Sequence, residues 1–190
     1  MIQQRALSHS LPEQAPAGTS YWEAEDAERF ETYYERIFNY IRYRVHCRYT
    51  AEDLTSQVFE KMAAKRSTFR ADRSPLEVWL FALARNTVND YFRTQRRRRL
   101  LPLDDCRLES SVQKGPESLA ITRESEDRLL RAVNTLRSKE KHVVALKFGA
   151  GLRNVDIAEI TGISESNVGV LLYRAMKKLK LELEGEDNDE

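Results

Sequence analysis

Residues 154–183 constrain the fold more than any other segment of the chain. Ile157, Ala158, Gly162, Ile163, Val168 and Leu171 have the spacing of a helix-turn-helix. This motif needs a small residue where its two helices touch, a Gly where the turn takes a positive φ, and apolar residues that close the angle between the helices. Ser164 is expected to cap the long last helix, whose core side is formed by Val168, Leu171, Leu172, Ala175, Leu179 and Leu183.

Helices are also predicted for the remainder of the folded chain. Gly and Pro are scarce, with 7 and 5 residues, and long alternating β-branched stretches are absent. The first helix is expected over 24–45, on an apolar stripe of Phe30, Tyr33, Tyr34, Ile37, Phe38, Ile41 and Val45, with a charged opposite face. The second is expected from Thr50, as its cap, to about Lys65, followed by a polar loop over 66–73.

Start and stop signals set the other helices. Ser74 as the cap, Pro75 at the first helical position and Glu77 at the third predict a third helix that continues into the four arginines at 96–99. A helix bearing Leu129, Leu130, Val133 and Leu136 opens the second half of the chain. Ser138 is expected to cap the next helix, and Gly149 and Gly151 to end it.

The fold class predicted is all-α, with two helical domains joined by a flexible linker and a helix-turn-helix in the C-terminal one. The expected boundaries are a disordered extension at 1–21, a first domain at 22–99, a linker at 100–121, a second domain at 122–183 and an acidic tail at 184–190. The overall net charge is only +1. Each domain is nevertheless basic, and the linker and tail are acidic, which indicates a polyanionic partner. The alternative, and the commoner meaning of any single charge run, is a solvated face.

The helix-turn-helix predicts binding to duplex DNA, with a helical hairpin in a structural bundle as the alternative. Its second helix carries Arg174, Lys177, Lys178 and Lys180, which are suited to neutralising phosphates. The first turn, 164–167, is expected to present polar groups to base edges in the major groove.

Residues 85–93 interleave amides, aromatics and positive charge before the arginines at 96–99. Aromatic faces stack on unpaired bases and amides read base edges, so this stretch favours single-stranded nucleic acid. The alternative is a solvated helix end, because arginines there also complement the helix dipole.

Several function classes are excluded or unsupported. Apolar runs fall far short of the roughly 20 residues that cross a bilayer, so no membrane insertion is expected. The N-terminus has no apolar segment of a secretory signal, which predicts a cytoplasmic location. Cys47 and Cys106 are expected to be free thiols, and His9, His46 and His142 fit no catalytic or metal-ligand signature, so the chain is expected to be no enzyme and to hold no metal or cofactor.

Four stretches together resemble the extracytoplasmic-function (ECF) sigma factors, the two-domain branch of the sigma-70 family of bacterial RNA polymerase sigma factors. They are 51–59 (AEDLTSQVF), 69–75 (FRADRSP), 79–86 (WLFALARN) with Asp90 and Tyr91, and the helix-turn-helix with Asn167-Val168 and Tyr173-Arg174-Ala175. The resemblance covers about residues 28–183.

The resemblance implies a transcription initiation factor that directs core RNA polymerase to promoters, with the β′ clamp and β flap as its contacts. Residues implied to bind core polymerase are Asp53, Leu54, Gln57 and Phe59. Residues implied to bind and melt the minus 10 element, with a flipped base held by the loop, are Ser67, Phe69, Arg70, Asp72, Arg73, Asn86, Asn89, Tyr91, Arg93, Arg96 and Arg97. Residues implied to read the minus 35 element are Ser164, Glu165, Ser166, Asn167, Gly169, Arg174 and Lys177.

Two departures from the family pattern stand out. Ser56-Gln57 replaces the usual Gln-Glu, which removes one carboxylate from the polymerase-binding motif. Gly169 stands where the recognition helix commonly has Lys or Arg. Either Gly169 permits a close backbone approach to DNA, or minus 35 reading is weak here.

Two other functions stay open on the sequence alone. One is a polymerase-independent helix-turn-helix regulator of duplex DNA, and the other is an RNA-binding or adaptor protein. The resemblance also implies control by an anti-sigma factor and a linker that threads the polymerase. The acidic tail is expected either to be disordered or to fold back on Lys177, Lys178 and Lys180.

Overall fold

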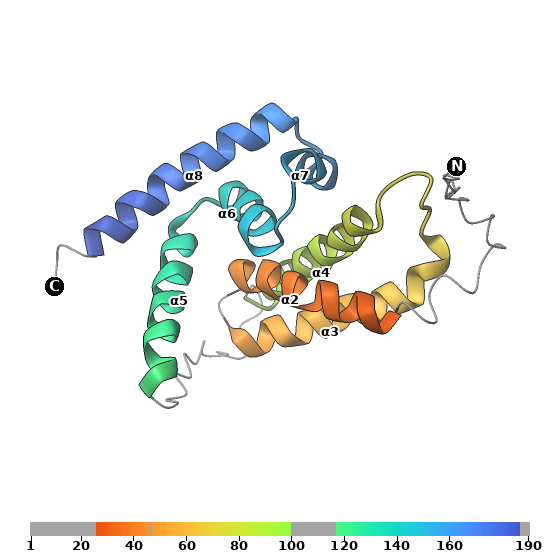
Figure 1. Ribbon diagram of the computed structural model, residues 1–190, viewed down its shortest axis with the longest axis horizontal. Helices are drawn as coiled ribbons and strands as arrows, with labels where there is room; N and C mark the ends of the chain where they lie inside the picture. Colours follow the sequence, from red (N-terminus) through yellow and green to blue (C-terminus); the bar gives the residue numbers. More distant parts are fainter. Residues whose placement is uncertain (1–25, 46, 100–116, 187–190) are drawn as a thin grey trace, which may run out of the picture.

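The computed structural model describes residues 26–45, 47–99 and 117–186, and every element in these ranges is helical (Figure 1). An N-terminal region comprises α2 (Asp26–Arg44), α3 (Arg48–Lys65), the short 3-10 helix η1 (Arg66–Thr68) and α4 (Leu76–Arg99). A C-terminal region comprises α5 (Glu117–Thr135), α6 (Ser138–Val144), the π-helical turn η2 (Ala145–Gly149), α7 (Asn154–Thr161) and α8 (Glu165–Glu186). The predicted extension, His46, most of the linker with Cys106, and the end of the tail lie outside the described residues, and 117–121 belong to α5.

The N-terminal region forms around the apolar stripe predicted on the first helix. Ile37, Ile41 and Val45 are buried, whereas Tyr33, Tyr34 and Phe38 are half-buried beside them. They pack against residues of α3 and α4 that include Leu54, Val58, Leu80, Phe81 and Val88. Helices α2, α3 and α4 therefore form one bundle in which each helix packs against the other two (Figure 1).

The predicted caps of two helices are wrong by a few residues. Helix α3 begins at Arg48 with extended Cys47 as its N-cap, so Thr50 lies inside the first turn. Helix α6 includes Ser138, and its N-cap is Arg137, whose backbone amide donates to Glu140 Oε2 at 3.1 Å. A cap must have extended backbone just before the first helical residue, and neither hydroxyl occupies that position.

Ser74 also has a different role from the cap predicted for it. Helix α4 begins at Leu76, and the Trp79 amide donates to the Pro75 carbonyl at 3.2 Å. The Ser74 hydroxyl instead donates to Glu159 Oε1 on α7 at 2.8 Å. A residue of the loop before α4 is thus bonded to the C-terminal region.

The helix-turn-helix is confirmed in its details. Gly162 ends α7 with φ of 74°, and its amide donates to the Ala158 carbonyl at 2.8 Å. Ser164 caps α8, since its Oγ accepts a hydrogen bond from the Asn167 amide at 3.3 Å. Val168 is fully buried at the angle between the two helices.

The later turns of α8 close a second core with α5 and α6. Its buried members are Ala132, Val133, Leu136, Val144, Ala175 and Leu179, with Leu172 and Leu183 half-buried against them. Lys178 crosses from α8 to α6 and donates to both oxygens of Glu140 at 2.8 Å. Glu140 is 5% exposed, so this ion pair sits at the edge of the second core.

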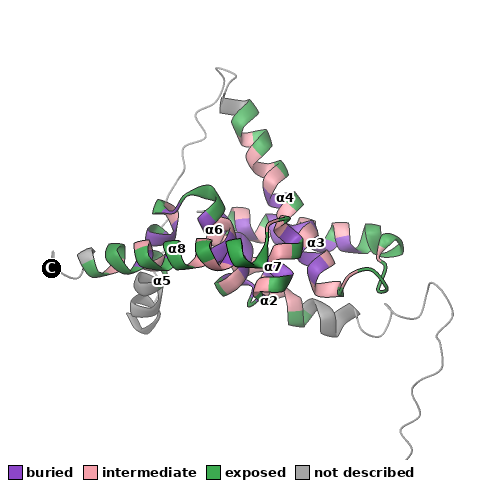
Figure 2. Cartoon of the chain, turned by 90° about the horizontal axis from the view of Figure 1, so that it is seen from above, coloured by how far each residue is buried: buried purple, intermediate pink, exposed green. Residues whose placement is uncertain are grey.

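The first core extends across the two regions without a break. It joins Ile37 and Tyr40 of α2 to Leu146, Ala150 and other buried residues of the C-terminal region. Helices α6 and α7 lie over α2 and α4, with α8 on the far side (Figure 1), and Figure 2 shows buried segments concentrated where the regions meet. The described helices therefore form one closed body.

Candidate nucleic-acid interface

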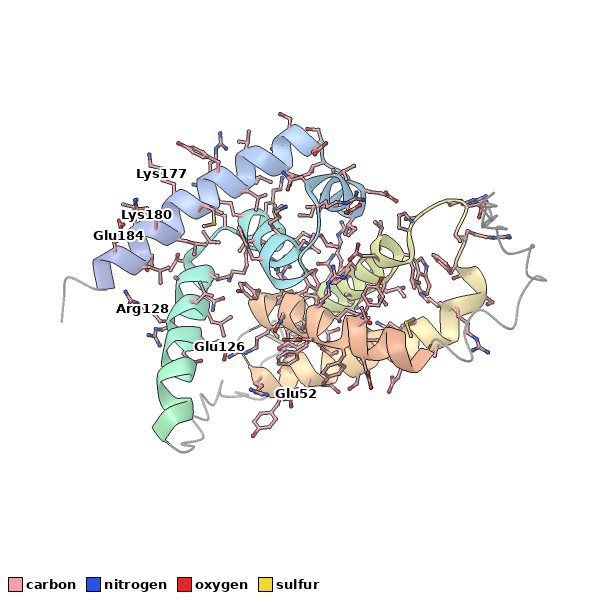
Figure 3. All side chains as sticks on the ribbon, viewed as in Figure 1. Glu52, Glu126, Arg128, Lys177, Lys180 and Glu184 are labelled. Atoms are coloured by element: carbon pink, nitrogen blue, oxygen red, sulfur yellow. The ribbon has the colours of Figure 1, made fainter. Side chains whose placement is uncertain are left out.

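The start of α8 presents a polar surface to solvent. Ser164, Glu165, Ser166 and Asn167 are all exposed, because Val168 turns its side of the helix into the core. Arg174 and Lys177 are exposed farther along α8, and Figure 3 shows Lys177 projecting away from α2–α4. Polar groups on the first turn and cations behind them match what a recognition helix requires.

Two of the cations that the sequence assigned to phosphates also make ion pairs within the protein. Lys178 is held by Glu140, and hydrogen bonding to Lys178 is the main cause of the lowered pKa of the Glu140 carboxyl. Lys180 Nζ lies 3.5 Å from Glu184 Oε1, four residues on along the same helix (Figure 3). Arg174 and Lys177 are thus the best-placed phosphate ligands of the four.

Gly169 lies in the interior of α8 with open space around it. A Cβ built on this residue meets no atom of the described chain within 4 Å. No packing contact among the described residues therefore requires a glycine at this position.

The loop before α4 is exposed around one anchored aromatic. Ser67, Arg70, Asp72 and Arg73 are exposed, whereas Phe69 is half-buried with its ring centroid 5.3 Å from that of Trp79. The Phe69–Trp79 contact fixes the loop on the side of α4 and leaves its polar groups free to meet a ligand.

The predicted single-strand surface of α4 is only partly exposed. Asn86, Arg93, Arg96 and Arg97 are exposed, and Asn89 and Tyr91 are half-buried. The Tyr91 and Phe92 ring centroids are 5.4 Å apart, and Arg93 lies 3.4 Å from Asp90. Amide, aromatic and cationic groups thus occur along one helix, as base stacking and phosphate binding require.

The predicted polymerase-binding residues of α3 divide into two groups. Leu54 and Phe59 are 3% and 8% exposed and belong to the core. Asp53 is exposed and Gln57 half-buried, and Gln57 Nε2 donates to Asp53 Oδ2 at 2.8 Å. Only the polar pair is positioned to touch a partner on this surface.

A cationic cluster between the two regions was missed by the sequence analysis. The Arg44 guanidinium donates to His142 Nδ1, and the Tyr40 ring packs edge-on against both His142 and Phe81. Burial lowers the pKa of His142 to about 3, with Arg44 and Arg85 adding to the effect. Burial also raises the pKa of Tyr40 to about 12. Tyr40 and Arg44 lie three and seven residues after Ile37, beside the apolar stripe of the first helix, so their helical spacing was the signal that could have found them.

The described residues offer no site for a metal and no membrane-spanning element. No group of three or more His, Cys, Asp or Glu side chains within the described ranges is arranged to hold a metal ion. No described helix combines the length and apolarity needed to cross a bilayer. Cys47 is a free thiol.

Sequence comparisons identify relatives of both regions. Residues 29–98 match the family described as Sigma-70 region 2, and residues 126–179 match the family described as Sigma-70, region 4. The ECF RNA polymerase sigma factor BldN of Streptomyces coelicolor is 33% identical over 170 residues, which make up 89% of this chain and 63% of BldN. The ECF RNA polymerase sigma factor SigX of Bacillus subtilis is 27% identical over 159 residues, or 82% of this chain and 81% of SigX.

Two solved structures share the fold. The sigma factor RpoE from Bartonella quintana, in complex with the anti-sigma factor NepR, has a TM-score of 0.65 at 20% identity, over 85% of this chain and 98% of RpoE. CnrH, in complex with the cytosolic domain of CnrY, has a TM-score of 0.63 at 18% identity, over 84% and 87% of the two chains. The ordered matches to regions 2 and 4, together with the named relatives, show that the chain belongs to the sigma-70 family of RNA polymerase sigma factors, in its non-enzymatic ECF branch.

Proposed function

We propose that the chain binds core RNA polymerase and directs it to promoters, reading the minus 35 element with α8 and opening the minus 10 element with α4 and the loop before it. The observation that carries this proposal is the pairing of two different nucleic-acid surfaces in one chain. One is a helix-turn-helix suited to duplex DNA, and the other is an aromatic and amide surface suited to unpaired bases. A regulator of duplex DNA alone has no use for the second surface.

The polar face of α3 is proposed to dock on the β′ clamp. Asp53 and Gln57 provide the direct contacts, while buried Leu54 and Phe59 hold α3 in place from beneath. Ser56 is exposed beside them and adds no charge, so Asp53 supplies the carboxylate of this contact. The β flap is proposed to bind the C-terminal region.

The loop at 66–73 is proposed to hold a flipped minus 10 base. Flipping a base costs a few kcal/mol of lost stacking and pairing, so a preformed pocket is favoured over one that orders on binding. Phe69, packed on Trp79, supplies a fixed wall, and exposed Ser67, Arg70, Asp72 and Arg73 supply polar contacts. Asn86, Asn89, Tyr91, Arg93, Arg96 and Arg97 are proposed to follow the opened strand along α4.

The first turn of α8 is proposed to enter the major groove at minus 35. Ser164, Glu165, Ser166 and Asn167 face the bases, with Gly169 nearest the DNA backbone and Arg174 and Lys177 on phosphates. We also propose an anti-sigma factor as partner, because RpoE and CnrH were both solved with protein partners, and a cytoplasmic location, where RNA polymerase works.

Run-off transcription with bacterial core RNA polymerase tests the proposal, on a pool of upstream sequences from the source genome. Discrete transcripts should appear only when the protein is added. Asn86→Ala should abolish them, whereas Glu31→Ala, an exposed change on α2 outside the proposed surfaces, should leave them intact. Binding to duplex DNA by the protein alone, without any transcript, would instead establish the polymerase-independent regulator.

A further inference from the structure

Four polar side chains lie together where α2 packs against α4 and α6 (Figure 1). They are Tyr40 and Arg44 of α2, Arg85 of α4 and His142 of α6. Tyr40 is fully buried and Arg44 is 9% exposed, whereas Arg85 and His142 are half-buried. These four residues are called the donor cluster from here on, because each of them has a hydrogen to donate.

Contacts within the donor cluster determine which nitrogen of His142 carries the proton. The Arg44 guanidinium donates to His142 Nδ1. A guanidinium has no acceptor atom, so Nδ1 must be the acceptor and carries no proton. Burial, together with the charges of Arg44 and Arg85, lowers the pKa of His142 to about 3, which keeps the ring neutral. The single ring proton is therefore on Nε2, and Nε2 is a hydrogen-bond donor.

Two donors of the cluster are buried without a partner. Neither the Tyr40 hydroxyl nor His142 Nε2 makes a hydrogen bond to any of the described residues. Their rings are in edge-on contact, with centroids 5.9 Å apart. Burial raises the pKa of Tyr40 to about 12, so the hydroxyl keeps its proton and can donate. Burying a donor without an acceptor is costly, so each of these atoms calls for an acceptor.

The donor cluster also carries positive charge that no carboxylate balances. Burial is the main cause of the lowered pKa of Arg44, and the charge of Arg85 contributes to it. Burial likewise lowers the pKa of Lys141, the residue before His142, and Arg44 adds to this effect. Among the described residues, no carboxylate forms an ion pair with any of these three cations. Enclosed cations without a counter-charge destabilise a fold, so an anion bound here would stabilise it.

We propose that the donor cluster is a binding site for one small tetrahedral oxyanion of the phosphate or sulfate class. The hydroxyl, the Nε2–H and the guanidinium N–H groups all donate, so the ligand must accept at several atoms, as an oxyanion does. The planar N–H pairs of Arg44 and Arg85 match two oxygens of one oxyanion and favour it over a spherical chloride ion. A water molecule also accepts hydrogen bonds but leaves the charge unbalanced. None of the four residues is among those proposed to contact DNA or polymerase, so oxyanion binding is independent of the proposed function.

Thermal unfolding of the full chain, with inorganic phosphate as the probe, tests the site. At neutral pH and constant ionic strength, replacing chloride with about 10 mM phosphate should raise the melting temperature by about 3 °C or more, because the ligand binds only the folded state. Sulfate should act like phosphate. The low concentration keeps the general stabilising effect of these anions small. Equal melting temperatures in phosphate and chloride would overturn the proposal.

Arg85→Met locates the bound anion, because it removes one cation of the cluster and keeps an unbranched side chain. This variant should lose the rise in melting temperature with phosphate. Arg131→Met, an exposed change on α5, should keep it. A rise of the native size in Arg85→Met would mean that phosphate binds elsewhere on the protein, and the donor cluster would not be the site.

Tyr40→Phe guards against a folding defect in the arginine variant, because it removes only the unpartnered hydroxyl. Without phosphate, its melting temperature should equal or exceed that of the native protein, since a buried donor without a partner is lost. The phosphate concentration that gives half of the rise should increase about threefold or more, as one hydrogen bond to the anion is missing. An unchanged phosphate concentration would contradict the proposal.

Nitrogen-15 NMR of labelled histidine observes a ligand-binding atom directly. The Nε2 resonance of His142 is identified by its absence in His142→Phe. Phosphate should shift this resonance, and chloride at the same ionic strength should leave it in place. A resonance that does not move while phosphate raises the melting temperature would also refute binding at the donor cluster.

Discussion

His142 shows how one residue reports on the packing of the two regions. A guanidinium can only donate, so the Arg44 contact requires His142 Nδ1 to accept and the ring to be neutral. A proton added at Nδ1 would point at the guanidinium in a site that is shielded from water. Tyr40 packs against this ring, and Arg44 and Arg85 act on it electrostatically. None of these three side chains carries a negative charge at neutral pH that could stabilise a protonated His142.

Acid should therefore weaken the folded state through His142. Its pKa falls from the usual 6.5 to about 3 in the closed protein, so the unfolded chain binds a proton that the folded chain excludes. Stability is fully present above pH 6.5 and is lost as the pH falls toward 3, by about 2 kcal/mol between pH 7 and pH 5. Urea unfolding at both pH values should show this loss in the native sequence and little of it in His142→Phe, and equal losses in both proteins would contradict it.

Gly169 is expected to lower the stability of α8, and its replacement tests whether it serves DNA binding. Because a Cβ meets nothing within 4 Å, Gly169→Ala should raise the free energy of unfolding by about 1 kcal/mol through helix propensity alone. If DNA approaches this backbone closely, the same change should reduce affinity for a minus 35 duplex in the presence of polymerase. Denaturant unfolding and DNA titration measure the two effects separately.

Gly169→Arg distinguishes the two explanations of this glycine. An added phosphate contact should steepen the dependence of log affinity on log salt by about 0.9. Tighter and steeper binding would contradict a close backbone approach and favour intrinsically weak minus 35 reading. Weaker binding at all salt concentrations would support the close approach.

At the scale of helices, the sequence predicted which segments are helical more accurately than it predicted where each helix begins. Strong signals, such as Gly162 and Ser164 around the turn, act through local backbone geometry and appear as predicted. Thr50 and Ser138 were wrong as caps because a hydroxyl near a helix start is not selective about position. Ser74 was wrong because its partner, Glu159, is 85 residues away.

The Glu140–Lys178 pair links α6 to α8 and should matter for the stability of the C-terminal region. Glu140→Gln removes the charge while keeping the shape, and leaves Lys178 without its paired carboxylate. We expect a loss of about 1–3 kcal/mol, since hydrogen bonds to charged groups are stronger than neutral ones. Chemical unfolding should detect it, and Glu182→Gln, an exposed change on α8, should have almost no effect.

For the whole molecule, the sequence predicted two helical regions but not their association. Periodicity identified the stripe of Ile37, Ile41 and Val45, which packs within the N-terminal region. Tyr40 and Arg44, three and seven residues after Ile37, lie beside this stripe, and they are fully buried and 9% exposed. A local window does not predict the burial of an Arg at such a position, because the distant C-terminal region covers it.

For the candidate site too, the sequence predicted what depends on one helix and missed what depends on contacts between helices. Exposed polar positions, such as Asn86 and Ser164–Asn167, follow from which side of a helix is apolar. The burial of Leu54 and Phe59 follows from packing against α2, and the capture of Lys178 follows from a partner 38 residues away. These features depend on tertiary contacts, which a motif does not encode.

The core shared by the two regions should determine how many thermal unfolding transitions the whole protein shows. Because Tyr40, Leu146 and Ala150 are buried only when both regions are folded and associated, the native protein should unfold in one cooperative calorimetric transition. A Cβ on Gly149 would lie 3.1 Å from backbone atoms of Asn39 and Tyr40 in α2. Gly149→Leu should therefore push the regions apart and divide that transition into two, one for each region. Lys139→Leu, an exposed change on α6, should keep the single transition. Two transitions in the native protein would mean that the regions fold independently and that the shared core contributes little to the stability of either.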